Sequence, residues 1–239
     1  MSDIKTKAIV IKSSDYKEND KLINIFTLES GKLTVQAKSV KNAKSKLKIF
    51  TQSFCFADFE ITQKGSTYIL TGGSVIDSFF ALTGDMDKFK AGAAILEVVD
   101  AGMREGEVRP EVFVILLKAL KTLCYDNAAG TIVLIKFLTD ILAVQGYRLN
   151  LNKCGKCGSD FFNRIYLNIE SGEFVCLSCR SLNDYIEVPL PVYNAVRIIS
   201  NADYAKLDSI KINGQILDDA VKLLIRNIND KFACKIKAV

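Results

Sequence analysis

Four cysteines form two closely spaced pairs in the third quarter of the chain, and their type and spacing predict a metal site. The pairs are Cys-x2-Cys motifs separated by eighteen residues, and their members are Cys154, Cys157, Cys176 and Cys179. Two cysteines three positions apart on a turn present both sulfur atoms to one point, and a second such turn completes the thiolate tetrahedron that Zn²⁺ accepts. Gly155 and Gly158 are expected to supply the positive φ angles of the first turn. The cysteine quartet therefore predicts one bound zinc ion.

Two disulfides or four free thiols are the alternative states of this cysteine quartet. Residues 1–20 are polar and charged and lack the apolar stretch of a signal peptide, so we expect a cytoplasmic, reducing compartment where disulfides do not persist. Free thiols stay open for a site that has lost its metal, but the intact spacing favours zinc. The other cysteines stand alone in apolar surroundings and are expected to be buried structural residues. They are Cys55, Cys124 and Cys234.

The chain contains no histidine, which limits the chemistry of the zinc site. Catalytic zinc usually has histidine ligands and an open position for water, whereas four thiolates close the coordination sphere, so we expect a structural ion. Histidine is also the commonest general base, and the chain has neither a Walker A motif nor G-x-G-x-x-G. We therefore expect a protein that is not an enzyme. The alternative is a Mg²⁺ enzyme built on Asp15, Glu18 and Asp20, although solvated loop acids are far commoner.

Positive charge is concentrated in one stretch of the N-terminal third. Residues 30–57 hold six lysines and no acidic residue, whereas the net charge of the whole chain is only +5. The candidate phosphate-binding residues are Lys32, Lys38, Lys41, Lys44, Lys46 and Lys48. Because a lysine run is often just a solvated surface, its interpretation as a phosphate-binding strip depends on the structure around it.

That surrounding structure is a series of five short segments rich in β-branched residues, typical of strands. They are residues 6–12, 22–28, 32–37, 53–62 and 67–75. Five strands with one long polar connection at residues 39–49 favour a small closed barrel such as the OB-fold over an open sheet. Such barrels bind single-stranded nucleic acid through a basic groove and stacking aromatics, for which Tyr16, Phe26 and Phe50 are candidates, although a barrel aromatic is more often core. We expect residues 1–80 to be an OB-fold nucleic-acid-binding domain.

From about residue 80 the apolar residues recur every three or four positions, which is typical of helices. We expect helices at residues 86–104, 110–125, 131–146, 189–200 and 217–233. Residues 81–239 are therefore predicted to form an α-helical domain with the zinc module, residues 150–187, inserted into it. The predicted class is multidomain α+β. The longest apolar runs are much shorter than a bilayer span, so we expect no membrane partner.

Short stretches along nearly the whole chain, in this order and spacing, carry a family resemblance. In the N-terminal part they are Ala8–Ile11, Glu18–Leu22, Thr27, Gly31–Leu33 and Ala37–Lys38. In the remainder they are Glu97, Pro110–Phe113, Leu116–Leu117, Phe137–Leu138, Gly146–Leu149, Cys154–Gly158 and Ser171–Cys176. No single stretch is decisive, but together they resemble RecO, a family of bacterial recombination mediators and DNA repair proteins.

The resemblance implies an OB-fold, a helical domain with an inserted zinc module, no bond-cleaving activity and a role in the RecF pathway. It implies binding of single- and double-stranded DNA, annealing of complementary strands, and association with the nucleoid when bound. It also implies that RecR and the C-terminal tail of single-stranded-DNA-binding protein are partners, and that the protein helps to load RecA. For the tail, the candidate basic residues are Lys118, Lys121, Arg148, Lys222 and Arg226.

The chain departs from the family pattern in two ways. Family members often have glycine where this chain has Ser39, and many use arginine where residues 1–80 use only lysine. Lysine contacts phosphate as a point charge without the planar fork of arginine. The lysines would act by neutralising phosphates and lowering the repulsion that opposes annealing. The alternative from another class is a zinc-ribbon adaptor that binds RNA or protein in transcription or translation, because the same lysines suit RNA.

Overall fold

The computed structural model describes residues 2–160, 164–181 and 185–237 of the 239-residue chain. The chain divides into two compact units. The first unit comprises Met1–Gly84 with Leu96–Leu120, and the second comprises Asp85–Ile95 with Lys121–Val239. Two helices, α1 (Met86–Gly102) and α2 (Pro110–Tyr125), contribute residues to both units. The predicted domain boundary near residue 80 stays a prediction, because the units share these helices.

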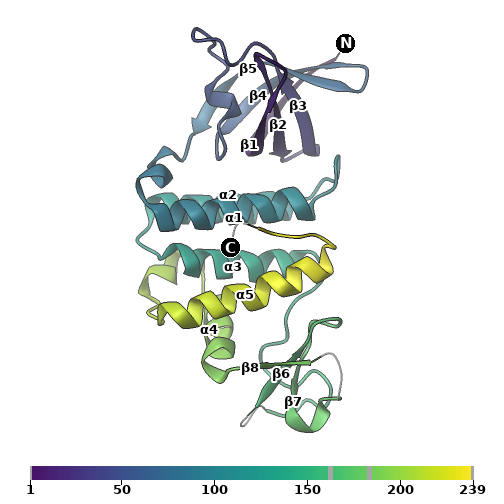
Figure 1. The fold of residues 1–239 in the computed structure, drawn as a ribbon, viewed down its shortest axis with the longest axis vertical. Coiled ribbons are helices and arrows are strands. Elements are labelled where there is room, and N and C mark those ends of the chain that lie inside the picture. Colours follow the sequence, from purple (N-terminus) through teal and green to yellow (C-terminus); the bar gives the residue numbers. More distant parts are fainter. Residues whose placement is uncertain (1, 161–163, 182–184, 238–239) are drawn as a thin grey trace. The chain divides into compact units, whose positions relative to one another are not determined.

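A closed five-stranded barrel forms most of the first unit (Figure 1). Its strands are β1 (Ser2–Tyr16), β2 (Asp20–Thr27), β3 (Gly31–Ala37), β4 (Phe56–Lys64) and β5 (Thr67–Asp77). They are hydrogen-bonded in the order β1-β2-β3-β5-β4, and the pairing of β1 with β4 closes the barrel. Adjacent strands are antiparallel except β3 and β5, which pair in parallel at Val35 and Gln36 only. The five predicted strands are confirmed.

Strand β1 is much longer than its predicted span because it serves two neighbours. Residues 2–9 pair with β4 and residues 8–16 pair with β2. The register between β1 and β2 shifts between Val10 and Lys12, just after the residues that pair with β4 end. A bulge increases local twist and bend, so a single strand can close the barrel. The predicted segment covered only the central, most apolar part of this strand.

The barrel interior is filled by the alternating apolar side chains of its strands. Ile23 and Ile25 of β2, Val35 of β3, and Phe59 and Ile61 of β4 are almost completely buried in one cluster. Residues at i and i+2 point to the same face of a strand, so this alternation fixes the register of each strand. The sequence pattern therefore determines which residues point outward and are available for binding.

Residues 96–120 belong to the first unit and pack on the outside of the barrel strands. The Phe113 ring on α2 lies 6.3 Å from the ring of Phe26 and 6.1 Å from that of Phe56, measured between centroids. The start of β3 fits closely against the segment that joins α1 and α2. Gly31 has a φ of +68°, and a Cβ there would lie 2.1 Å from the carbonyl oxygen of Glu107. Only glycine satisfies both the backbone angle and this approach.

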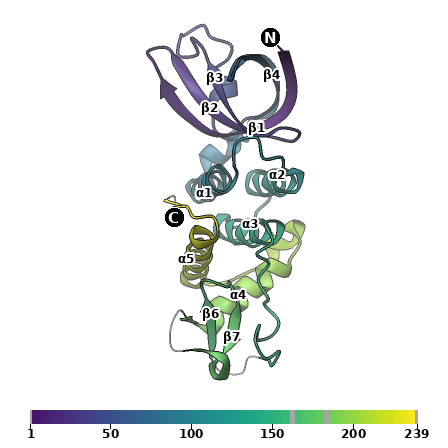
Figure 2. The same ribbon diagram turned by 90° about the vertical axis from the view of Figure 1, so that its right-hand side faces the viewer.

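The second unit combines three helices with a small sheet (Figure 2). Helices α3 (Gly130–Val144), α4 (Leu190–Asn201) and α5 (Gly214–Lys231) pack against one another. The sheet has the order β7-β6-β8, with β6 (Ile165–Asn168), β7 (Phe174–Cys176) and β8 (Tyr185–Val188). All five predicted helices are confirmed within a few residues at each end. The sheet was not predicted, because strands of three or four residues leave too short a pattern to detect.

Four short 3-10 helices lie between these elements in the described part of the chain. Side-chain caps explain where two of the longer helices begin. The 3-10 helices are η1 (Ile49–Thr51), η2 (Phe80–Gly84), η3 (Leu177–Cys179) and η4 (Tyr204–Ser209). Asp85 accepts hydrogen bonds from the N–H groups of Asp87 and Lys88 at the start of α1, and Asn213 accepts one from Gln215 at the start of α5. Side-chain caps of this kind satisfy donors that have no partner within the helix.

Within the described ranges, none of the helices is both long enough and apolar enough to cross a membrane.

Candidate metal centre and nucleic-acid interface

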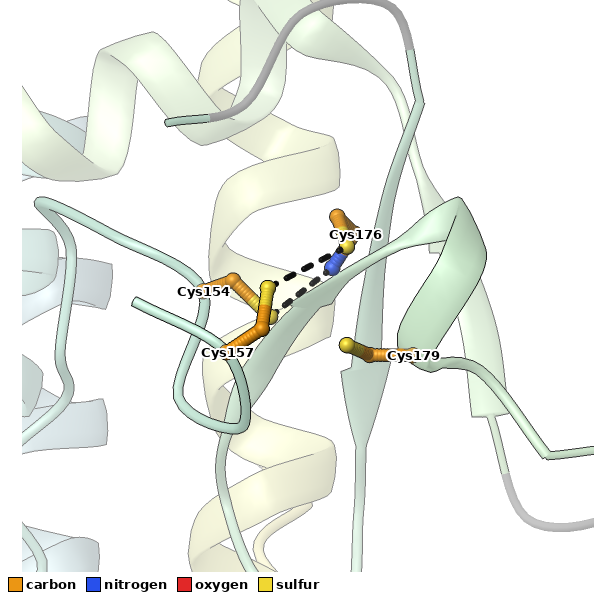
Figure 3. Close-up of side chains that lie close together, drawn as sticks. All are labelled: Cys154, Cys157, Cys176 and Cys179. Carbon is orange, nitrogen blue, oxygen red and sulfur yellow. Dashed lines mark hydrogen bonds between the residues drawn. The ribbon is translucent and has the colours of Figure 1, made fainter. Parts of the chain in front are cut away.

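The four cysteines of the quartet converge on one point (Figure 3). Their sulfur atoms all lie within 4.8 Å of one another, and the Sγ atoms of Cys157 and Cys176 are 3.8 Å apart. Zinc–sulfur bonds of about 2.3 Å in a tetrahedron require sulfur atoms about 3.8 Å apart, so the cluster is close to the size that a metal needs. The quartet can bind a metal ion, as the spacing predicted.

Two tight turns bring the pairs together. In the first, the Gly158 N–H donates to the Cys154 carbonyl, and the Cys154 N–H donates to the Ser159 carbonyl, both at 2.9 Å. The second pair lies where β7 ends at Cys176 and η3 begins. The Cys176 N–H points at the Cys154 sulfur atom, 3.4 Å away. A backbone donor aimed at sulfur favours the thiolate form that a metal binds.

The two glycines of the first turn serve different purposes. Gly158 has a φ of +71°, which confirms the prediction for this residue. Gly155 does not adopt a positive φ, so that part of the prediction is wrong. Its role is space: a Cβ there would lie 3.2 to 3.4 Å from the side chain of Glu173, while its N–H donates to the Phe174 carbonyl at 2.9 Å. Glycine therefore lets the first turn lie directly on strand β7.

The thiols of the quartet differ in their affinity for protons. The Ser159 hydroxyl beside Cys157 contributes most to lowering the pKa of that thiol to about 6. The hydrogen bond between Cys179 and Cys157 is the main reason that the pKa of Cys179 rises to about 12. Burial of Cys154 raises its pKa, but backbone hydrogen bonds outweigh this effect and the net shift is downward. A metal ion replaces the protons shared among such thiols, so its binding releases protons.

Among the described residues, the remaining cysteines and Asp15, Glu18 and Asp20 are not in a group that could hold a metal ion. Cys55 is buried, and burial raises its pKa to about 11, whereas Cys124 and Cys234 are only partly buried. Across residues 2–160, 164–181 and 185–237, the quartet is the one group of three or more Cys, Asp or Glu side chains close enough together to hold an ion. Asp15 forms an ion pair with Lys41, and Asp20 accepts hydrogen bonds from residues 36 and 39. These contacts give Asp15 and Asp20 a structural role.

The lysines predicted to bind DNA fall into two groups. Lys38, Lys44, Lys46 and Lys48 are exposed on the connection between β3 and η1. Lys41 is on the same connection and is half-buried beside Asp15, with 2.9 Å between its Nζ and a carboxylate oxygen. The apolar residues that alternate with these lysines hold the connection against the barrel core. Val40 is 1% exposed, and Leu47 and Ile49 pack on the same core.

Lys32 lies apart from this group, on the outer side of β3. Its Nζ is 2.6 Å from the carbonyl oxygen of Asp100 and 3.7 Å from a carboxylate oxygen of the same residue. Lys12 and Asn24 bind the same carboxylate, at 3.1 and 2.8 Å. Glu105 accepts hydrogen bonds from the N–H and hydroxyl of Thr34, at 2.7 and 3.3 Å. Acidic residues of the first unit thus occupy the outer face of β2 and β3.

Of the three aromatic residues considered for stacking, one has an exposed ring. Phe26 is fully buried against Phe113, and Phe50 is 7% exposed with its ring packed on Phe59 in the barrel core. Tyr16 is 37% exposed. Sequence reasoning missed the anchoring roles of Asp15, near the end of β1, and Asp20, at the start of β2.

The combination of a closed barrel with a basic connection and a helical unit with a four-cysteine cluster defines a two-domain α+β protein with a metal-binding site. Family models fit both parts. The model described as recombination protein O, N terminal, matches residues 1–79, and the model described as recombination protein O, C terminal, matches residues 83–233. The chain belongs to the RecO family.

Full-length relatives agree with this assignment. The chain is 28% identical over 239 residues to the DNA repair protein RecO of Clostridium novyi, covering 100% of this chain and 93% of the relative. It is 29% identical over 235 residues to that of Clostridium acetobutylicum, covering 98% and 94%. It is 26% identical over 234 residues to that of Dehalococcoides mccartyi, covering 96% and 92%. Family membership gives the protein a role in DNA repair and recombination.

Proposed function

We propose that the protein is a non-enzymatic recombination mediator that binds single- and double-stranded DNA and anneals complementary strands. The observation that carries this proposal is the connection of residues 38–48, in which buried apolar residues alternate with lysines that point outward. A strip of cations fixed on a rigid barrel can follow a phosphate backbone, whereas a flexible lysine tail has no defined path. With RecR, the protein would help to load RecA onto DNA coated by single-stranded-DNA-binding protein.

The barrel supports the proposal because its strand order agrees with that of an OB-fold. Five strands in the order β1-β2-β3-β5-β4 close on themselves, with a long connection after β3. OB-folds bind oligonucleotides on the face of strands 2 and 3 and on adjoining loops. In this protein Asp100 and Glu105 occupy that face. We therefore assign DNA binding to the basic connection.

The proposed mechanism is electrostatic. Lys38, Lys41, Lys44, Lys46 and Lys48 would replace counterions on the phosphates of one or two strands. Neutralisation lowers the repulsion between complementary strands and leaves the bases free to pair. Lys32 would contribute less than the four exposed lysines, because Asp100 lies beside its charge, and Lys41 is likewise paired with Asp15. For single strands, the slope of log affinity against log salt changes by about 0.7 for each phosphate contact, so binding should weaken steeply with salt.

The metal is proposed to be a single structural Zn²⁺ ion. Cys154, Cys157, Cys176 and Cys179 would hold it, and four thiolates leave no coordination position for a substrate. When bound, the ion supplies a cross-link between the two turns that carry the cysteines. Cys154, Tyr166 and Val175 form the small buried cluster beneath the site. The metal would add its binding free energy to the stability of this segment.

A groove in the second unit suits the acidic, apolar tail of single-stranded-DNA-binding protein. Ala91, Ala94, Leu134 and Val221 provide its apolar residues. Its polar lining residues are Asp87, Lys90, Thr131, Asp218 and Lys222. A tail with a terminal carboxylate would pair with the lysines while its apolar side chains enter the groove. Changing Lys90 and Lys222 to glutamate should abolish tail binding and leave binding of naked DNA unchanged.

The decisive experiment is charge reversal in the connection. A variant with Lys38, Lys41 and Lys44 changed to glutamate should lose at least tenfold in affinity for labelled single-stranded DNA and should lose strand annealing. The matched control reverses three exposed lysines of the second unit, Lys206, Lys211 and Lys235. A folded connection variant that binds as well as the wild type contradicts the proposal. If structured RNA outcompetes single-stranded DNA, the zinc-ribbon adaptor becomes the better assignment.

A further inference from the structure

We infer that the β1–β2 turn is a second part of the DNA-binding surface, in which the Tyr16 ring stacks on a base and Lys17 and Lys21 contact phosphates beside it. This inference rests on the proposed function and extends it, because a lysine strip alone does not distinguish single from double strands. A stacking side chain does. It requires a base whose face is open, which a duplex does not offer along its length.

Contacts between the turn and the connection make them one surface. The Lys41 N–H donates to the Asn19 carbonyl at 3.1 Å, and the Lys41 Nζ lies 2.9 Å from a carboxylate oxygen of Asp15. The Ser39 N–H donates to the Asp20 carboxylate at 2.8 Å. The residues on both sides of Tyr16 and Lys17 are thus tied to the start of the lysine connection. A strand that contacts Lys38 and Lys41 passes directly beside the turn.

The turn carries both kinds of group that single-strand binding requires. Tyr16 is 37% exposed at the end of β1, and the Nζ of Lys17 lies 5.2 Å from the centre of its ring. Lys17 has a φ of +55°, so the chain reverses direction at this residue. The reversal leaves the Lys17 ammonium group beside the Tyr16 ring. Bases stack on exposed aromatic rings, and a neighbouring cation adds to the attraction.

The charge of the turn favours phosphate in spite of its acidic residues. Asp15 is paired with Lys41, and Asp20 is committed to the Ser39 N–H and the Gln36 side chain. Glu18 is exposed on the turn. Lys17 and Lys38 both lie near Asp20, and Lys21 and Lys41 both lie near Asp15. Four lysines therefore lie close to these two carboxylates, and both carboxylates also have hydrogen-bond or ion-pair partners inside the protein.

The absence of tryptophan from the chain makes a direct test possible. In the full-length Y16W variant, the single indole reports on position 16. Oligothymidylate should quench its fluorescence on binding. An abasic oligodeoxyribose phosphate of the same length, and a blunt duplex, should bind through the lysines with little quenching. Equal quenching by the abasic chain, or none by oligothymidylate at saturation, would overturn the inference.

Affinity measurements separate this inference from the proposed function. Y16A should lose about fivefold or more in affinity for oligothymidylate, since stacking on one base is worth at least about 1 kcal/mol, and Y16F should stay within about twofold. Affinity for duplex DNA should be the same in all three proteins. If Y16A binds oligothymidylate like the wild type while charge reversal in the connection abolishes binding, the stacking role fails and the proposed function stands. If the wild type binds no DNA, both fail.

Discussion

The carboxylate of Asp20 accepts the backbone N–H of Ser39 at 2.8 Å, and this bond fixes the lysine-rich connection to the β1–β2 turn. The second oxygen of Asp20 accepts the side-chain amide of Gln36 at 2.9 Å. The N–H of Ser39 is the main cause of the lowered pKa of Asp20. One side chain thus positions the two segments to which we assign DNA binding.

Asparagine in place of Asp20 should change how barrel stability depends on pH. Because the folded-state pKa lies below the ordinary value of 3.8, the carboxylate stabilises the fold above about pH 4, and this contribution disappears as the pH falls through the lowered pKa. D20N should therefore be less stable than the wild type at pH 7, and the two should converge near pH 2. Urea denaturation followed by circular dichroism at several pH values measures this. D58N, at an exposed position of β4, is the control, and a difference between D20N and wild type that stays constant with pH would contradict the prediction.

Glycine at position 39 should stabilise the barrel. Ser39 has a φ of +52°, a left-handed conformation that costs residues with a Cβ about 1 to 2 kcal/mol. Part of this gain is offset because glycine has more freedom in the unfolded chain. S39G should therefore raise the free energy of unfolding by up to about 1 kcal/mol, and S39A should not. A loss of stability in S39G would mean that the serine side chain contributes more than the backbone angle costs.

Local patterns were sufficient to predict the barrel strands, the helices and the cysteine cluster. The alternation of apolar residues in β2 and β3 and the Cys-x2-Cys spacing are properties of neighbouring residues, so they are visible in the sequence. The consequence of Ser39 was not visible. Its departure from the family pattern was noted, but the positive φ that makes glycine favourable there is set by the bond to Asp20, nineteen residues earlier.

Removal of the metal should loosen the second unit and leave DNA binding by the barrel in place. The quartet joins two turns over a small cluster of three buried residues, so a chelator removes the cross-link between those turns. Hydrogen exchange should become faster around β6 and β7 while affinity for single-stranded DNA changes less than twofold. C157S should behave like the chelated protein, and C124S, outside the quartet, should behave like the wild type. Simultaneous loss of DNA binding would contradict this division of roles.

Contacts between distant segments explain what sequence reasoning could not supply. The charge count placed Lys32 with the other lysines, but its partner Asp100 is on helix α1, 68 residues away. In the same way, Phe26 is an aromatic residue and was therefore a candidate for stacking on a base. In the structure its ring packs against the ring of Phe113, which is 87 residues away in the sequence. Periodicity indicates which side of a strand a residue faces, but it does not indicate what covers that side.

A matched pair of substitutions should separate structural from DNA-binding lysines. The Lys32 side chain is only 14% exposed, and in K32Q the carboxylate of Asp100 loses this partner. The free energy of unfolding should therefore fall by about 1 to 3 kcal/mol. DNA affinity should remain within about twofold of the wild type, because the lost charge was already neutralised. In K44Q, stability should be unchanged, and the slope of log affinity against log salt should become less steep by about 0.7, equivalent to one phosphate contact. Fluorescence titrations of a labelled single strand between low and physiological salt, with denaturation curves of the same samples, measure both quantities. A reduced salt slope in K32Q would instead mean that DNA draws Lys32 away from Asp100 and that all six lysines act together.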